Sequence, residues 1–354
     1  MSRQEATSVL QLGLDGPVNT YFRNIIAEPG FPFRLEAIAT ASHPELAGKR
    51  LGKTGLKHPP VLTKVPIINL DTAIQSTDSP VAFSGLKGEA AAHYDNLAAA
   101  DRVVFANDAA YRMDRDVPLT NTYVGSSQMD ELFSVPRSRH IVAVGNCTSG
   151  IGSTVFEPLH RAIGLASLRL DTLQGWSSAG LSEIPKDGYY KPTKMPDDDE
   201  KDKLETEPRK MLGSLEQPAD IHISAKPKRS TWLDGHYIEA DVTFRRPTSS
   251  EEVEDALRSF RAPKEVRGFK YGENSPRRKP IKLTNRQLLL TDGGCGFQPL
   301  PRLHPMRVIV SLGELTGENQ DRVTIKMVGH NLALGAAGGS ASNMLLARQR
   351  GYIS

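Results

Sequence analysis

Two residues of the chain, Cys147 and His236, could together carry out nucleophilic catalysis. Cys147 stands in HIVAVGNCTSGIGSTVFEPLH, residues 140–160, a pattern typical of a buried strand, then Asn146, then a helix whose first turn is rich in Ser, Thr and Gly. Unpaired N–H groups and the helix dipole at such a position favour the thiolate, which is the nucleophilic form of cysteine. The alternative interpretation is a buried structural cysteine.

A nucleophile of this kind needs a base, and His236 is the best placed of the nine histidines. It follows Gly235 in WLDGHYIEAD, at the start of a segment that we expect to form an edge-type strand, so the ring would lie at one end of a sheet. Histidine is the commonest general acid and base in enzymes. A hydrogen-bonded structural histidine is the alternative interpretation.

The first 150 residues predict a parallel sheet covered by helices. Short apolar runs bounded by turn residues recur there with helical or polar segments between them: SVLQLGL, RLEAIAT, PVAFSGL, DRVVFAN and HIVAVGN. Continuous apolar strands of this kind are typical of parallel sheets with both faces covered. We therefore expect an α/β fold with a Rossmann-like N-terminal domain.

The second half of the chain has a different pattern, with longer alternating segments such as GHYIEADVTFRR, MRVIVSLGEL and RVTIKMVGH. Alternation places Ile238, Ala240, Val242 and Phe244 on one face of a half-solvated sheet. We expect an α+β domain with a mixed or antiparallel sheet. The chain ends in HNLALGAAGGSASNMLLARQRGYIS, in which small residues lead into a helix that could pack closely against another element.

Composition narrows the classes of protein. With 354 residues the chain is long enough for two domains, and its net charge of +3 is spread in mixed sign, which argues against a nucleic-acid partner. No run approaches the roughly 18 apolar residues of a membrane span, and the first residues lack the pattern of a signal peptide, so we expect a cytoplasmic protein. Two cysteines cannot form a disulfide framework, and both reactive and inert roles remain open for Cys295.

The segment VLQLGLDGPVNTYFRNII, residues 9–26, predicts the first strand, turn and helix of a dinucleotide-binding domain. Gly13 and Gly16 follow the strand, but position 19 is Asn in place of a third glycine. That glycine normally permits close helix–strand packing, so its loss concerns the geometry of the turn more than a direct phosphate contact. No Asp or Glu ends the second strand, and this absence favours a 2′-phosphorylated cofactor.

A series of ordered motifs in the chain resembles those of the aspartate-β-semialdehyde dehydrogenases, above all the archaeal and fungal branch. They are FANDAAYRMDRDVPL, GNCTSG, DTLQGWSSAG, EKDKLETEPRKMLG, RSTWLDGH and GHNLALGAAGGSASN. The resemblance implies a dinucleotide-binding domain over residues 1–146, completed by a helix at 331–354, and a catalytic and dimerisation domain over 147–330. It also implies a homodimer or homotetramer.

The resemblance assigns roles to individual residues. It implies Cys147 as the nucleophile and His236 as the acid–base partner, with Gln174 and Asn146 beside them. It implies that Arg112 and Lys203 hold the phosphate of an acyl phosphate or semialdehyde substrate, that Arg229 holds its α-carboxylate, that Glu200 holds its amino group, and that Asn107 belongs to the same set. Its implied cofactor residues are Gly13, Gly16, Val18, Ser42, Ser84, Gly85 and Asn331. It implies no metal.

Departures from the family's pattern collect on the cofactor side. The family's G-x-T-G-x-V-G becomes GLDGPVN, in which Asp15 adds a negative charge beside an expected pyrophosphate. The arginine of its S-x-R-S-A-G-K is missing from SHPELAGK, although Lys49 and Arg50 lie nearby. NADP is the expected cofactor, with NAD or no cofactor as alternatives.

Three functional hypotheses follow. The first is NADP-dependent reductive dephosphorylation of β-aspartyl phosphate to aspartate semialdehyde, or the reverse reaction, through a thioester on Cys147. The second is cofactor-free acyl transfer from an acyl phosphate through the same cysteine. The third, a non-catalytic binding protein, fits poorly with so complete a set of catalytic residues.

Overall fold

The first half of the chain forms a seven-stranded sheet in which every strand pairing is parallel. The computed structural model describes residues 6–178, 193, 195, 198–285, 288 and 304–353; Cys295 lies outside them. The strand order is β3-β2-β1-β4-β5-β7-β6. The strands are β1 (Thr7–Leu12), β2 (Phe33–Thr40), β3 (Ile67–Asn69), β4 (Val81–Ser84), β5 (Val103–Ala106), β6 (Leu119–Thr120) and β7 (His140–Val144).

This strand order makes a crevice between β1 and β4. The chain leaves β1 toward β2 and leaves β4 toward β5, in opposite directions across the sheet. Right-handed crossovers then place α1 (Gly16–Ile26) on one face, and α2 (Leu70–Ser76) and α3 (Gly88–Ala98) on the other. Ligands of such sheets bind outside the carboxyl ends of the strands at this switch point.

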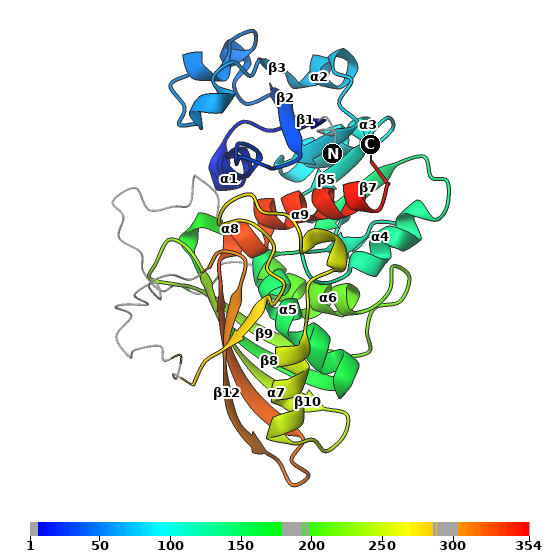
Figure 1. The fold of residues 1–354 in the computed structure, drawn as a ribbon, viewed down its shortest axis with the longest axis vertical. Coiled ribbons are helices and arrows are strands. Elements are labelled where there is room, and N and C mark those ends of the chain that lie inside the picture. Colours follow the sequence, from blue (N-terminus) through cyan, green and yellow to red (C-terminus); the bar gives the residue numbers. More distant parts are fainter. Residues whose placement is uncertain are drawn as a thin grey trace.

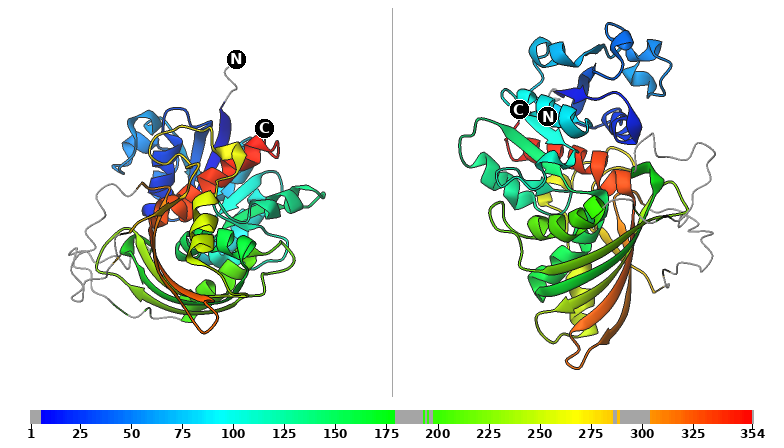
Figure 2. Two further views of the ribbon diagram at one scale, coloured as in Figure 1. Left: turned by 60° about the horizontal axis from the view of Figure 1, so that its bottom comes forward. Right: turned by 180° about the vertical axis from the view of Figure 1, so that it is seen from behind.

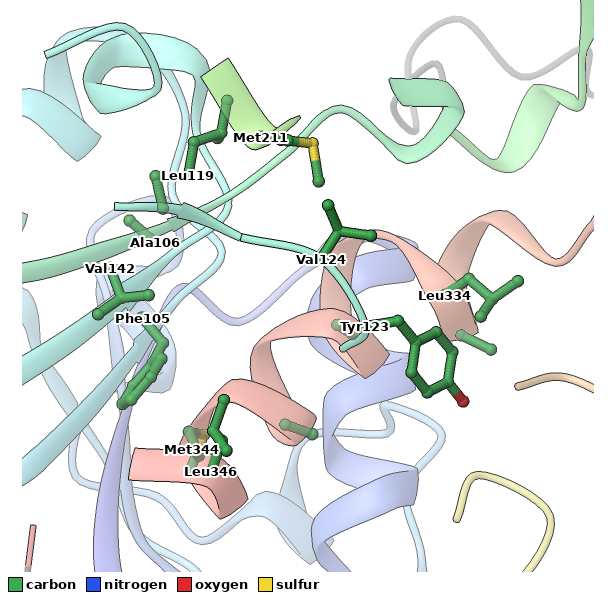
Figure 3. Packing of buried hydrophobic residues seen from close by; sticks show 14 of the residues in the cluster. Phe105, Ala106, Leu119, Tyr123, Val124, Val142, Met211, Leu334, Met344 and Leu346 are labelled. Carbon is green, nitrogen blue, oxygen red and sulfur yellow. The ribbon is translucent and has the colours of Figure 1, made fainter. Parts of the chain in front are cut away.

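The C-terminal segment returns to the parallel sheet (Figure 1). Helix α8 (Asn331–Leu334) leads into α9 (Ala336–Gln349), which packs against α1, β5 and β7. The expected close packing of its small residues is confirmed, because every residue of 337–347 is buried. Figure 3 shows Met344 and Leu346 of α9 near Phe105 of β5, within the main hydrophobic core.

The second half forms a six-stranded mixed sheet with the order β11-β12-β13-β10-β8-β9. Its strands are β8 (Leu165–Gln174), β9 (His222–Arg229), β10 (His236–Phe244), β11 (Ile281–Leu283), β12 (Val308–Thr316) and β13 (Arg322–Gly329). Two pairings, β8 with β9 and β11 with β12, are parallel, and the others are antiparallel. The expected fold class is therefore confirmed.

One prediction about this sheet is wrong: β10 is an interior strand, not an edge strand. Antiparallel partners β8 and β13 flank it along its length, and Ile238, Ala240, Val242 and Phe244 are buried on the expected common face. Local alternation reports which face of a strand is buried but not how many neighbours it has. The ring of His236 is nevertheless at the end of the sheet, because β10 begins with that residue.

Helices fill the concave side of the second sheet, which curves around them (Figure 2). They are α5 (Cys147–Ala162), which contacts β8, β10, β12 and β13, α6 (Asp198–Leu212), which lies against β9, and α7 (Ser250–Ser259), which packs on α5 and β11. A further helix, α4 (Ser126–Phe133), lies beside β6. Within the described part of the chain, no helix combines the length and the apolar character needed to span a membrane.

Candidate active site

A continuous pocket of about 710 Å³ joins the crevice of the parallel sheet to the end of the mixed sheet. Its walls come from the segments that follow β1, β4, β5 and β7, and from β8, α6, β9 and the start of α8. Of the predicted site residues, the following line it: Gly16, Val18, Gly85, Asn107, Arg112, Asn146, Cys147, Gln174, Glu200, Lys203, Arg229 and Asn331. Gly13, Ser42, Ser84 and His236 do not, and His236 is fully buried behind Cys147.

Cys147 and His236 form a hydrogen-bonded pair at the centre of the site. The Sγ atom of Cys147 lies 2.9 Å from Nε2 of His236. Cys147 is the first residue of α5, and Asn146 caps that helix by accepting from the N–H of Thr148 at 2.8 Å. A thiol at a helix N-terminus and a histidine at a strand start are thus brought together from residues 89 positions apart, within the reach that nucleophilic catalysis needs.

The backbone around His236 accommodates either neutral tautomer of its ring. The N–H of Gly175 lies 2.9 Å from Nδ1 and can donate to it, which leaves the proton on Nε2, facing Cys147. The same N–H is 3.0 Å from the carbonyl oxygen of Gly235, and Nδ1 is also 3.0 Å from that oxygen, so Nδ1–H can donate there instead. His236 can therefore present Nε2 to Cys147 as a donor or as an acceptor.

The helix N-terminus favours the thiolate of Cys147, as expected, but other groups in the site act against it. Burial and the carboxylate of Glu200 raise the pKa of Cys147 to about 12, and they outweigh Arg112, Arg229 and the N–H of Thr148, which act in the other direction. Burial also lowers the pKa of its partner, His236, to about 3. Both groups are neutral near pH 7, so a reaction through the thiolate would require proton transfer from Cys147 to the ring.

Slow alkylation should reveal this raised pKa. We expect the rate constant for carbamidomethylation of Cys147 by iodoacetamide to rise about tenfold per pH unit from pH 7 to pH 9.5, because the thiolate fraction rises by that factor below the pKa. Peptide mass spectrometry of Cys147 would follow the reaction, with glutathione as the reference thiol. A plateau below pH 8 would contradict the raised pKa.

Strand register aligns three of the predicted residues at the end of the mixed sheet. His236 of β10 pairs with Gln174 of β8, and Gln174 pairs with Arg229 of β9. Arg229 donates to Oγ of Ser178 at 3.0 Å and stands over the ring of Trp176, 5.7 Å from its centroid, so its guanidinium is held in place. The ring of His236, the amide of Gln174 and the guanidinium of Arg229 therefore come from adjacent positions on three neighbouring strands.

One face of α6 carries four charged residues toward the site. Glu200 accepts from Nδ2 of Asn146 at 2.9 Å, and Lys203 pairs with Asp199 at the pocket wall. Glu207 and Lys210 continue this face inward, and both are buried. Their spacing of three and four residues is the periodicity of a helix face.

Glu207 and Lys210 are residues that the motif comparison of the sequence missed. Glu207 accepts from the backbone N–H of Asn146 at 2.5 Å and from Arg112 at 2.9 Å. Lys210 donates to the carbonyl oxygens of Arg112 and Val117, both at 2.8 Å, and so fixes the loop that carries Arg112. The extension of the E-x-x-K pattern by E and K at positions 207 and 210 was the signal that could have identified them.

Three polar groups at the site have no hydrogen-bond partner among the described residues. They are Nε2 of Gln174, Nε of Arg112 and Oδ1 of Asn107, all buried atoms of residues that line the pocket. Buried polar groups are usually satisfied, so orphaned donors and acceptors beside a cavity indicate contacts made with a ligand. Arg112 in particular keeps a free donor although Glu207 and the carbonyl oxygen of Asn107 hold its other nitrogens.

Gly335 lets the C-terminal segment approach Cys147 closely. A Cβ atom at this position would lie 2.6 Å from Cα of Cys147 and 2.8 Å from the carbonyl oxygen of Asn331. Next to it, Asn331 is fixed by accepting from the N–H of Gly235 and donating to Oγ of Ser177, at 2.9 and 2.8 Å. The junction of α8 and α9 therefore forms a rigid wall of the pocket.

The substitution Gly335→Ala should damage both stability and the site. We expect a loss of about 1–3 kcal/mol in the free energy of unfolding, because the methyl group meets backbone atoms that cannot rotate away. Chemical denaturation would measure the loss. Gly268→Ala is the matched control, since Gly268 is exposed and nothing lies within 4 Å of the place that an added methyl group would occupy. Equal stability of the two variants would contradict the steric argument.

At the other end of the pocket, Asn19 replaces the third glycine of the dinucleotide turn and ties the turn together. Its Nδ2 donates to the carbonyl oxygens of Asp15 and Gly85, at 2.7 and 3.3 Å, and its Oδ1 accepts from Gln11 at 3.4 Å. The amide fills the space that a side chain at Gly85 would need. The replacement of this glycine by Asn19 therefore does not open the turn, because the hydrogen bonds of Asn19 hold the strand, the turn and the helix together.

The remaining predicted cofactor residues differ in their access. Gly13 lies in the turn with φ +99°, and Ser84 is buried at the end of β4. Ser42 is exposed beyond β2, where its Oγ lies 3.4 Å from Oγ1 of Thr40. Among the residues that the structure describes, no cluster of three or more His, Cys, Asp or Glu side chains is arranged to hold a metal ion.

The fold and the site define a two-sheet α/β protein in which a Rossmann-type crevice leads to a paired cysteine and histidine. No family model matches the sequence. Curated relatives do: aspartate-semialdehyde dehydrogenase of Archaeoglobus fulgidus is 27% identical over 95% of this chain and 96% of its own length, and that of Methanothermobacter thermautotrophicus is 26% identical over 94% and 96%. The chain is a divergent relative of the aspartate-semialdehyde dehydrogenase family.

Solved structures share the fold. The aspartate semialdehyde dehydrogenase of Candida albicans, solved with NADP, superimposes with a TM-score of 0.81 at 21% identity over 99% of this chain and 100% of that one. The enzyme II of Vibrio cholerae, complexed with ASA, gives 0.73 at 20% identity over 99% and 100%. At such identities the likeness concerns the architecture, and the chemistry must be argued from the residues of this chain.

Proposed function

We propose that the chain catalyses the NADP-dependent interconversion of β-aspartyl phosphate and aspartate semialdehyde through a thioester on Cys147. The observation that carries the proposal is the 2.9 Å contact between Sγ of Cys147 and Nε2 of His236 in a pocket that continues into the crevice between β1 and β4. Relatives named for this activity, and a structural neighbour solved with NADP, support the choice of substrate and cofactor.

Cys147 and His236 perform the covalent chemistry in this proposal. Sγ attacks the acyl carbon of the acyl phosphate while Nε2 of His236 takes the thiol proton, the C–O bond to phosphate breaks, and a thioester remains. This step needs the tautomer with a free Nε2, which the carbonyl oxygen of Gly235 stabilises by accepting from Nδ1–H. His236 later returns the proton as Cys147 is released.

Charged side chains around the pair match the charges of the substrate. Arg229 can hold the α-carboxylate with two parallel hydrogen bonds, and Glu200 faces the pocket where it can accept from the ammonium group. Arg112, through its free Nε, and Lys203 would bind the phosphate. The orphaned Nε2 of Gln174 is placed to donate to the acyl oxygen.

The crevice fits a dinucleotide. The N-terminus of α1 has no side-chain cap, and Gly16 has open space where a side chain would be, so its first turn can bind a pyrophosphate. Val18, Gly85 and Asn331 line the path from there to Cys147. When bound, the nicotinamide exchanges the hydride that relates the thioester to the aldehyde.

The domain limits and the assembly belong to the same proposal. We assign residues 1–146 and 331–354 to a dinucleotide-binding domain, and 147–330 to a catalytic and dimerisation domain, because β1–β7 and β8–β13 form separate sheets and α9 packs on the first. A homodimer or homotetramer, which the resemblance to the family implies, belongs to the same proposal.

Two measurements test the function. Purified protein with aspartate semialdehyde, inorganic phosphate and NADP⁺ should produce NADPH in a phosphate-dependent manner. In a second experiment, exposure to β-aspartyl phosphate alone should add an aspartyl group to Cys147, which mass spectrometry would detect. Adduct formation without NADPH production would favour the cofactor-free acyl transfer. Absence of both would overturn the proposal.

A further inference from the structure

Asp15, the residue that departs most from a dinucleotide-binding turn, has a partner. Its Oδ2 lies 2.6 Å from Nε2 of His43, which joins the turn after β1 to the segment after β2. The other ring nitrogen, Nδ1, lies 3.1 Å from Oε1 of Glu45, in a 3₁₀ turn (Pro44–Leu46). The backbone N–H of His43 donates to Oγ1 of Thr40 at 3.3 Å, which anchors the residue to the end of β2.

Both ring nitrogens of His43 face carboxylate oxygens, and a neutral imidazole can donate from only one of them. The imidazolium satisfies both contacts. The hydrogen bonds with Glu45 and Asp15 accordingly raise the pKa of His43 above its ordinary value. The other charged groups that act on this cluster are Lys49, which interacts with Glu45, and the buried Arg23, which interacts with Asp15.

The contact with His43 also determines where the Asp15 carboxylate points. Asp15 is the N-cap residue of α1, yet its side chain accepts no capping hydrogen bond from that helix. The first turn of α1 therefore keeps its N–H groups for another anion, and Asp15 to Asn19 form that part of the pocket wall. The negative charge of Asp15 thus interacts with the His43 ring and not with the N-terminus of α1.

We propose that the His43 imidazolium neutralises Asp15, allowing the N-terminus of α1 to bind the pyrophosphate of a dinucleotide, so that dinucleotide affinity depends on the charge of His43. The inference rests on the proposed function for the nature of the ligand. His43 acts through Asp15 on the pyrophosphate, a group that NADPH and NADH share, so both should respond alike.

The sign of the effect follows from linkage. The protonated ring and the bound anion favour each other, so affinity falls as the pH rises through the pKa of free His43, and binding takes up protons in that range. Because His43 and Asp15 are each about one-third exposed, with side-chain fractions of 37% and 32%, salt should weaken the dependence.

Isothermal titration calorimetry on the full chain tests this inference. The dissociation constants of NADPH and NADH would be measured from pH 5.5 to 9, and proton uptake would be obtained from buffers of different ionisation enthalpy. We expect an affinity about three- to tenfold lower at the high-pH end for both dinucleotides, with net proton uptake between the two limits. His43→Gln should show the high-pH affinity throughout, and Asp15→Asn the low-pH affinity throughout.

His93→Gln is the matched control, because His93 is exposed on α3 and should behave as the unmodified chain does. Binding with no pH dependence and no proton uptake overturns this inference and leaves the proposed function standing. An effect on NADPH alone also overturns it, since His43 would then contact the 2′-phosphate directly. No dinucleotide binding at any pH, in Asp15→Asn as well, overturns the inference and the proposed function together.

Discussion

Replacing Cys147 with serine should lower kcat/KM for phosphate-dependent oxidation of aspartate semialdehyde by a factor of about 10³ or more. Serine preserves the size of the side chain and its place at the start of α5, 2.9 Å from the ring of His236 in the parent chain. Its hydroxyl is far less acidic than a thiol, so transfer of its proton to His236 costs more free energy than transfer from Cys147. The thioester step therefore fails while binding survives.

Binding and stability separate this outcome from misfolding. Cys147→Ser should retain the NADPH affinity and the thermal midpoint of the unmodified chain, because the pocket wall and the Asn146 cap are unchanged. It should gain no aspartyl adduct from β-aspartyl phosphate. Thr148→Ser, one residue along the same helix turn, is the matched control and should keep most of the activity. Turnover of Cys147→Ser within tenfold of the parent would exclude Cys147 as the nucleophile.

The local pattern of apolar residues in the sequence was sufficient to predict those parts of the fold that depend on residues close together in the chain. The parallel strands, the helix that begins at Cys147 and the buried face of β10 all follow from runs and alternation of apolar residues. The interior position of β10 did not, because the partners β8 and β13 are separated from it by long stretches of chain.

The electrostatics of the site depended on the fold in the same way. A helix N-terminus alone predicts an acidic thiol, but burial raises the pKa of Cys147 to about 12, and distant segments contribute to its surroundings, among them Gly335 from the far end of the chain. The sequence likewise contains no sign that the charge of Asp15 has a partner. His43 is 28 residues away, and the two side chains meet because β1 and β2 are paired in the sheet.

The second large effect should come from Glu207, whose carboxylate connects Arg112 to Asn146, the residue that caps α5. Its side chain is 1% exposed and that of Arg112 12%, and the two form an ion pair at 2.9 Å. Burial opposes the charge of Arg112, but the ion pair and hydrogen bond with Glu207, together with Cys147 and Glu200, outweigh it and raise the pKa of Arg112. Glu207→Gln should lower the free energy of unfolding by about 3–5 kcal/mol, because it leaves a buried guanidinium without its counter-charge.

A double-mutant cycle distinguishes this loss from a general packing defect. The pair Arg112→Met and Glu207→Gln should cost much less than the sum of the two single changes, because it removes both charges together. Asp202→Asn is the matched control, since it removes one negative charge from an exposed position of the same helix, and it should change the stability by less than about 0.5 kcal/mol.

Additive losses in the cycle would show that the ion pair does not hold Arg112 in place. Glu207 would then be a packing residue, and the link from α6 to Arg112 would have to run through Lys210 and the carbonyl oxygens that it binds.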